Sequence, residues 1–207
     1  MTSPGNESRQ DFKCGEFLPD GASPLDPDEA EGLIPAHITT RGELNAWEQA
    51  NILKAAGWLR KRRLASPVLD LGFVRELHRR MFSDTWEWAG KFRKTLKNIG
   101  VPPELVLERT KTMLDDVQYW IDNDTYSIDE IAARFHHSLV AIHLFPDGNG
   151  RHGRLMTDAL LHQAGSLPFT WGSASLDVEG GARKRYIRAL QAADAGDYAL
   201  LFSFVRT

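Results

Sequence analysis

The stretch that decides the fold runs from Ser127 to Gly165 and reads SIDEIAARFHHSLVAIHLFPDGNGRHGRLMTDALLHQAG. It opens with a capping box between Ser127 and Glu130, which marks the start of a helix. Apolar side chains then recur at helical spacing, namely Ile131, Phe135, Leu139 and Ile142. A turn with one proline and two glycines follows, and a second helix begins near Arg151 and stops at Gly165. The stretch therefore predicts a central helix, a glycine-rich turn and a following helix.

Helical periodicity continues on both sides of this stretch. It predicts further helices at about 44–63, 71–82, 103–121, 179–193 and 197–204. The segment 93–101 contains Asn98 and Gly100, which indicate an irregular hairpin, and no series of strands is visible. The predicted class is all-α, with a short irregular or β-hairpin flap. We expect residues 1–32, rich in Gly, Pro, Ser and acidic residues, to form a flexible N-terminal arm. We expect residues 33–207 to form a single helical domain.

Composition excludes several classes of protein. The chain has 207 residues, 42% of them hydrophobic, and 25 Lys+Arg against 28 Asp+Glu give a formal charge of 25 − 28 = −3. That balance disfavours nucleic-acid binding or anionic-membrane binding driven by net charge. Cys14 is the only cysteine, which excludes an internal disulfide and fits a reducing compartment. No apolar run is long enough for a signal peptide or a membrane helix, so we expect a cytoplasmic protein.

The residues after the central helix form an anion cradle by their chemistry. Gly148 and Gly150 flank Asn149, so the backbone can approach a ligand closely and present successive N–H groups at a helix N-terminus. Arg151 and Arg154 are three residues apart and share one helix face, where each can bind phosphate oxygens. This combination predicts a site for two successive phosphates.

Two more side chains extend the predicted chemistry. Asp147 lies where a hard cation such as Mg²⁺ belongs, because Mg²⁺ takes one or two carboxylates plus substrate phosphates. His143, just before the turn, can act as a general base near neutral pH. Taken singly, each of these residues also has an ordinary role in a turn, a helix end or a surface ion pair. Taken together, they favour phosphoryl-type transfer.

A metal-dependent hydrolase using His137, His143 and Asp147 is an alternative. Adjacent histidines at 136 and 137 point about 100° apart on a helix, and no second carboxylate has a suitable local spacing. Both facts weigh against a metal site of that kind. We expect His152 and His162 to lie on the surface, and the six tryptophans to serve packing.

The stretch HLFPDGNGRHGR, from His143 to Arg154, resembles the signature HPFxDGNGRxxR of the Fic family (filamentation induced by cAMP). Only Leu144 departs from it, and this apolar residue is expected to change loop packing more than chemistry. The segments LHRRMF at 77–82 and AGDY at 195–198 are also similar to the family, so the resemblance covers about 44–204. Within the family, HITTRGELNAWEQANI and KNIGV are similar to the group called mobile mystery protein B.

The resemblance implies a helical protein that transfers AMP from ATP to a Ser, Thr or Tyr hydroxyl of a target protein and releases pyrophosphate. His143 would deprotonate the hydroxyl, and Asp147 would hold Mg²⁺ against the α- and β-phosphates. Residues 148–150 would form the anion hole. Arg151 would bind the β-phosphate, and Arg154 the γ-phosphate. These implied roles agree with the roles assigned from the residue types alone.

The resemblance also implies a flap and an inhibitory helix. Residues 97–103 would align the backbone of the target, and a helix near 39–58 would carry an inhibitory glutamate. Glu43 matches the family pattern (S/T)xxxE(G/N) in part and would bind Arg154, although Glu43 can equally close a capping box with Thr40. A nucleotide-binding regulatory or antitoxin-like module without turnover is the alternative function. The target protein is unknown, and a homo-oligomer is left open.

Overall fold

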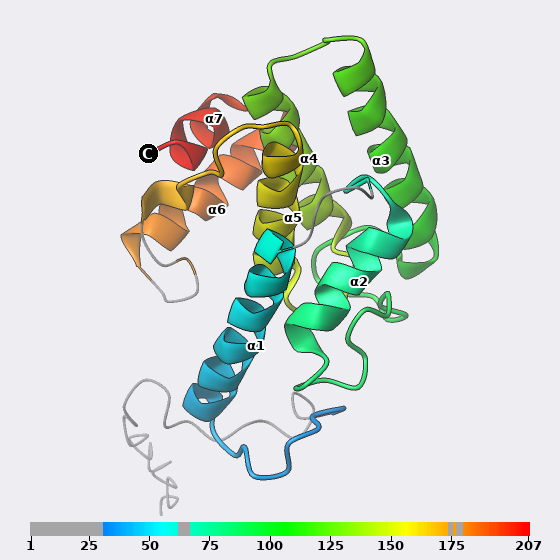
Figure 1. Ribbon diagram of the computed structural model, residues 1–207, viewed down its shortest axis with the longest axis vertical. Coiled ribbons are helices and arrows are strands. Elements are labelled where there is room, and N and C mark those ends of the chain that lie inside the picture. The colour runs from blue at the N-terminus through cyan, green and yellow to red at the C-terminus, as the bar shows by residue number, and fades with distance from the viewer. Residues whose placement is uncertain (1–30, 62–66, 174–175, 177–179) are drawn as a thin grey trace, which may run out of the picture.

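The computed structural model describes residues 31–61, 67–173, 176 and 180–207, and these residues form an all-α fold (Figure 1). The α-helices are α1 (Arg41–Lys61), α2 (Leu71–Phe82), α3 (Val106–Asp122), α4 (Ile128–Ile142), α5 (Asn149–Gln163), α6 (Gly181–Asp194) and α7 (Ala199–Val205). Short 3-10 helices occupy Pro103–Leu105 and Trp171–Ser173. The predicted bounds of α2 and α4 are confirmed. Helix α5 begins two residues before the predicted start, because Gly148 rather than Gly150 occupies its N-cap.

Helices α4 and α5 lie at the centre of the molecule (Figure 1). Helix α3 packs against one side of α4, and α6 and α7 pack together against its other side. Helices α1 and α2 form a second pair, and α2 contacts α5. One hydrophobic cluster joins α1 to α5 around Phe82, Phe135 and Phe145, and a second joins α4 to α7 around Tyr186 and Leu201. The junction between α4 and α5 is therefore held from several directions.

The start of α4 shows half of the predicted capping box. The Ser127 hydroxyl accepts a hydrogen bond from the Glu130 N–H at 3.3 Å, as expected for an N-cap. The Glu130 carboxylate pairs with Arg134 one turn further along, at 2.7 Å. The cap itself is present, and the glutamate serves an i,i+4 ion pair.

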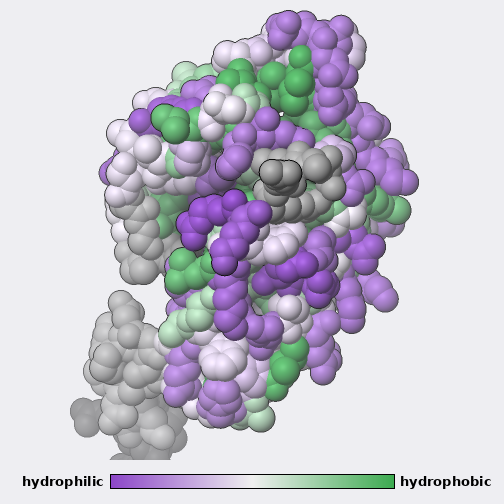
Figure 2. Space-filling model, in the orientation of Figure 1, coloured by the Kyte–Doolittle hydropathy of each residue, from purple (hydrophilic) through white to green (hydrophobic). Residues whose placement is uncertain are grey.

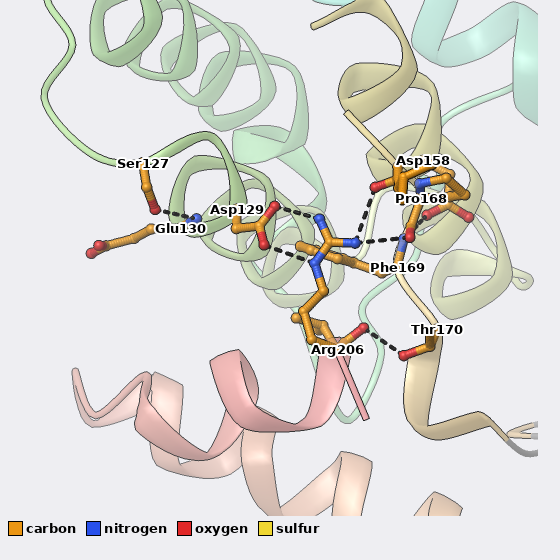
Figure 3. Close-up of polar contacts among 10 residues, drawn as sticks. Ser127, Asp129, Glu130, Asp158, Pro168, Phe169, Thr170 and Arg206 are labelled. Atoms are coloured by element: carbon orange, nitrogen blue, oxygen red, sulfur yellow. Dashed lines mark hydrogen bonds and ion pairs between the residues drawn. The ribbon is translucent and has the colours of Figure 1, made fainter. Parts of the chain in front are cut away.

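The C-terminal end of the chain is tied back to α4 by Arg206 (Figure 3). Its Nε donates to the Asp129 carboxylate at 2.7 Å, and its Nη1 donates to the carbonyls of Leu167 and Pro168. The guanidinium also lies 4.7 Å from the centre of the Phe169 ring. One side chain thereby links α7, the start of α4 and the loop after α5, which fixes the position of α7.

The flap at 93–101 is irregular, without the strand pairing of a β-hairpin. Within the described part of the chain, the isolated β-bridge joins Leu33 to Trp86 instead. The predicted N-terminal arm lies outside the described residues except for its last two. None of the helices described is both long and apolar enough to cross a bilayer. The face shown in Figure 2 is mainly hydrophilic, with small scattered apolar patches.

Candidate active site

His143 lies at the C-terminal end of α4, in the left-handed conformation with φ 56°. Its side chain is half-buried, and its Nδ1 is buried without a hydrogen-bond partner among the described residues. Burial lowers the pKa of His143, and the positive charge of Arg93 lowers it further. The imidazole is therefore neutral at pH 7, which is the form that can accept a proton.

Arg93 is a buried cation directly beside His143. The residue is 3% exposed, and its guanidinium donates to four backbone carbonyls, those of Thr95, Val101, Ile142 and His143. Two of these carbonyls belong to the flap, and the other two lie at the end of α4, where carbonyls have no partner within the helix. Burial lowers the pKa of Arg93. One side chain therefore clamps both ends of the flap to the end of α4.

The flap packs on His143 through Gly100. This residue has φ +98°, and a Cβ at this position would lie 2.6 Å from the His143 Cβ and 3.0 Å from the Ile142 carbonyl oxygen. Only glycine fits both the backbone conformation and the available space. The side chains of Leu96 and Ile99, in the middle of the flap, are 73% and 55% exposed.

The turn between α4 and α5 is closed by Asn149. Its side-chain amide donates to the Phe145 carbonyl at 2.8 Å and accepts from the Phe145 N–H at 2.9 Å. Gly148 has φ +76°, and a Cβ there would lie 2.5 Å from the Phe82 ring. The Asn149 side chain thus fixes the turn, and its backbone remains available to the anion site.

His78, on α2, contacts the same turn and supports it. Its ring stacks on Phe145 at 3.7 Å, its Nε2 donates to the Asp147 carbonyl at 3.1 Å, and its Nδ1 accepts from the Gly90 N–H at 3.0 Å. These partners fit the neutral ring protonated on Nε2. Burial holds the pKa of His78 well below its ordinary value. A histidine that is neutral at pH 7 therefore supports the backbone that carries Asp147.

The N-terminus of α5 faces this turn without a side-chain cap. Gly148 is the N-cap and makes no side-chain hydrogen bond to the helix. The first N–H groups of an α-helix have no acceptor within the helix, and the helix dipole adds positive potential there. The segment 148–150, predicted as an anion cradle, thus presents backbone N–H groups of the kind that a phosphate can satisfy.

Arg151 is held by Glu48, a residue that no pattern in the sequence singles out. Its Nη1 lies 2.6 Å from the Oε2 of Glu48 on α1, and the other Glu48 oxygen accepts from the Trp86 indole N–H at 2.6 Å. The Glu48 residue is 3% exposed. The Arg151 guanidinium also lies 3.6 Å from the Asp147 carboxylate and 5.1 Å from the centre of the Phe82 ring. A buried carboxylate thus neutralises the first of the two cradle arginines.

Arg154 is half-buried on the same face of α5, one turn after Arg151. Its charge lowers the pKa of His136, on α4, and of Asp158, further along α5. Burial outweighs this effect at Asp158 and raises its pKa to about 6. The second arginine of the cradle therefore lies between the turn and a buried carboxyl group.

Glu43 caps α1 in this structure. Its Oε2 accepts from the Thr39 N–H at 2.9 Å and from the Thr40 N–H at 3.1 Å, and the Thr40 hydroxyl accepts from the Glu43 N–H at 3.3 Å. These hydrogen bonds lower the pKa of Glu43. In this structure the Glu43 carboxylate closes the capping box instead of making the predicted contact with Arg154, because it accepts from the Thr39 and Thr40 N–H groups beside its own helix end.

The residues present fit a magnesium ion better than a zinc-type site. The Asp147 side chain is 65% exposed at the mouth of the cradle, and one carboxylate beside phosphate oxygens is a usual environment for Mg²⁺. No group of three or more His, Cys, Asp or Glu side chains in the described part of the chain is arranged to hold a metal. His137 is 2.8 Å from Asp194 and 3.1 Å from the Tyr198 hydroxyl, through its two ring nitrogens. The structure therefore gives the hydrolase alternative no support.

The expectation that His152 lies on the surface is wrong. The residue is 1% exposed, its Nε2 bonds the Val74 carbonyl at 2.9 Å, and burial lowers its pKa to about 4. The spacing of His152, Met156 and Ala159 along one face of α5 was the signal for burial, since both apolar residues are buried too. His162 is exposed, as expected.

Residues 68–161 match the model of the Fic/DOC family. Among curated proteins, the protein adenylyltransferase fic-1 of Caenorhabditis briggsae is 38% identical over 147 residues, covering 67% of this chain and 26% of that protein. Protein adenylyltransferase Fic of Drosophila grimshawi is 33% identical over 146 residues, covering 66% and 28%. This chain thus spans about a quarter of the length of these curated relatives.

Solved structures share the fold. Fic-1 of Caenorhabditis elegans superposes with a TM-score of 0.63 at 26% identity, covering 85% of this chain and 51% of that chain. The N-terminal FIC domain of Bep8 from Bartonella sp. 1-1C gives a TM-score of 0.68 at 19% identity, covering 86% and 95%. BepC of Bartonella tribocorum, solved with bound AMPPNP, gives 0.66 at 18% identity, with the same coverage.

Proposed function

Because this chain belongs to the Fic/DOC family, we propose that it is a protein adenylyltransferase that transfers AMP from ATP to a Ser, Thr or Tyr hydroxyl of a target protein. The observation that carries the proposal is the position of His143. A neutral imidazole stands at the end of α4, directly before an uncapped helix N-terminus that is followed by two arginines. A base and a polyphosphate cradle are thereby joined by one rigid turn.

The reaction follows from these positions. His143 accepts the proton of the target hydroxyl while the hydroxyl oxygen attacks the α-phosphorus. The bond from the α-phosphorus to the oxygen that bridges to the β-phosphorus breaks, and pyrophosphate leaves with that electron pair. The first N–H groups of α5 bind the phosphate oxygens, Arg151 the β-phosphate and Arg154 the γ-phosphate. Asp147 would hold Mg²⁺, which when bound offsets the charge of the phosphates.

The flap supplies the platform for the target. Arg93 fixes both of its ends to α4, and Gly100 lets it lie against His143. We assign residues 97–103 to the alignment of the target backbone beside the base. A segment held at both ends loses little entropy on binding, which favours a defined position of the acceptor hydroxyl.

We further propose that any inhibition by α1 acts through Glu48 and not through Glu43. Glu48 already occupies Arg151 at 2.6 Å, where a phosphate would bind, whereas the Glu43 carboxylate is used by the cap. A carboxylate and a phosphate compete for one guanidinium, so Glu48 would weaken nucleotide binding. The alternative function, a nucleotide-binding module without turnover, would need this ion pair to open before a nucleotide could bind Arg151.

The test uses α-labelled ATP, Mg²⁺ and cell extract, with label on protein followed by mass. We expect the wild type to label protein with AMP, His143→Ala to label none, and His162→Ala, the exposed histidine, to label as the wild type does. Label that survives His143→Ala would contradict the proposed base. ATP binding without label in any of the three proteins would favour the binding module.

A further inference from the structure

A groove runs beside the candidate active site, between α3 and α4. It has a volume of about 290 Å³, and the start of α7 closes one end through Tyr198. Its floor is apolar, formed by Met113, Trp120 and Ile142, and exposed Arg109 and Asp116 stand on its α3 side. This volume lies at the lower end of the 300–1,000 Å³ that is usual for small-molecule sites, and it is large enough for a single large side chain.

The groove is separate from the phosphate cradle. No residue from 143 to 154 is among those that line it. The cradle arginine Arg151 faces α1 and α2, through Glu48 and Phe82, whereas the groove is bounded by α3, α4 and Tyr198. The triphosphate and the occupant of the groove would therefore approach the end of α4 from different sides.

The groove and the base nevertheless share one rigid junction. Ile142 and Val101 line the groove, and the Val101 N–H donates to the Ile142 carbonyl at 3.3 Å. The Arg93 guanidinium binds the carbonyls of both residues and that of His143. The groove thus borders Ile142, the residue next to His143 in sequence, at the fixed end of the flap.

We propose that this groove binds an aromatic side chain of the target protein, close in sequence to the hydroxyl that is modified. This inference rests on the proposed function. An extended chain advances about 3.3 Å per residue, so a side chain one to four residues from the acceptor reaches the groove when the hydroxyl lies at His143. A flat ring can lie on the apolar floor that Trp120 helps to form, and its edge can meet the polar side chains of Arg109 and Asp116. The groove then selects targets, and the cradle performs the transfer.

The probe is a set of synthetic peptides with one threonine in an alanine background and one tryptophan placed at each flanking position in turn. We expect one placement to raise kcat/KM at least about tenfold over the peptide without tryptophan, as burial of a large apolar side chain allows. Ala141→Trp would fill the groove from its exposed edge and remove that preference. Asp115→Trp, on the exposed outer side of α3, is the matched control and should keep it.

Equal kcat/KM for all placements in the wild type, or a preference that survives Ala141→Trp, would overturn the proposal. A loss of ATP affinity in Ala141→Trp would also overturn it, because the groove would then hold the nucleoside. Binding of the same peptides, fluorescently labelled, to His143→Ala reports on the groove without turnover. Absence of label in all proteins, together with tryptophan-dependent binding to His143→Ala, would reject the proposed activity and keep the groove.

Discussion

Replacing Glu48 by glutamine removes the negative charge that Arg151 binds and keeps the shape of the side chain. Glu48 Oε2 and a β-phosphate on the same guanidinium would lie about 6 Å apart, and at an effective dielectric constant of about 20 their repulsion is on the order of 3 kcal/mol. Partial screening at Arg151, whose side chain is 20% exposed, reduces this value. We therefore expect Glu48→Gln to bind Mg²⁺–ATP about 10- to 100-fold more tightly.

The same change weakens the fold. Removing one member of a buried ion pair costs about 3–5 kcal/mol when the other charge is left without a partner. For Glu48→Gln we expect a loss of about 3 kcal/mol or less, because Arg151 keeps its contact with Asp147 and the glutamine oxygen can still accept from the Trp86 indole N–H. Urea unfolding should thus show a lower free energy of unfolding in the variant that binds ATP more tightly.

The assay is an isothermal titration with Mg²⁺–ATP and Mg²⁺–AMPPNP at two salt concentrations. Glu43→Gln is the matched control: it alters a capping carboxylate on the same helix, and we expect no change of nucleotide affinity. Equal or weaker binding by Glu48→Gln would refute the competition and would make Glu48 a residue that positions Arg151 for the phosphate.

Two further predictions concern the flap and the response to acid. Gly100→Ala should abolish AMP transfer, because its Cβ would lie 2.6 Å from the His143 Cβ. Gly165→Ala is the control: this position has a similar positive φ but nothing within 4 Å of a Cβ, so the variant should lose only about 1–2 kcal/mol of stability. Comparable transfer rates in the two variants would exclude the close approach of Gly100 to His143. Buried groups dominate the response to acid: the pKa is about 3 for His136, about 4 for His152 and about 6 for Asp158, and burial holds the pKa of His78 well below its ordinary value. The depressed histidine values mean that the unfolded chain binds more protons as the pH falls from about 6.5 toward 4, which costs on the order of 3 kcal/mol for His152 alone. Asp158 opposes this by taking up a proton in the folded state below about pH 6, but the buried histidines together outweigh it. Urea midpoints should therefore fall between pH 7 and 4.5, and equal midpoints would contradict the buried neutral histidines.

Local patterns were sufficient to predict the helices near the site. Ser127 and the apolar spacing after it define α4, and the turn glycines define where α5 starts to within two residues. The motif from His143 to Arg154 also brings its own members together, because a turn joins them directly. These features depend on neighbours in sequence, which is why the sequence could reveal them.

Local sequence patterns could not predict contacts between helices that are distant in sequence. Glu48 is one polar residue on a helix with several, and only the packing of α1 beside Trp86 and Arg151 makes it a buried carboxylate. Glu43 carries a family-like pattern, yet the nearer N–H groups of its own helix end take the carboxylate. His78 becomes a support for the turn only because α2 lies beneath it. The partners of Glu48 and His78 are far away in sequence, so spacing along the chain carries no signal for them, whereas the capping box of Glu43 was visible in the spacing of Thr40 and Glu43.

The anchoring of the flap by a single guanidinium has a consequence for how the recognition surface can change. Arg93 holds the flap through backbone carbonyls, and those hydrogen bonds do not depend on which side chains lie between the two anchor points. Leu96 and Ile99 face solvent in the middle of the flap. The side chains from 96 to 99 can therefore be replaced while the Arg93 hydrogen bonds, Gly100 and His143 stay in place, which under the proposed function would adapt the flap to another target.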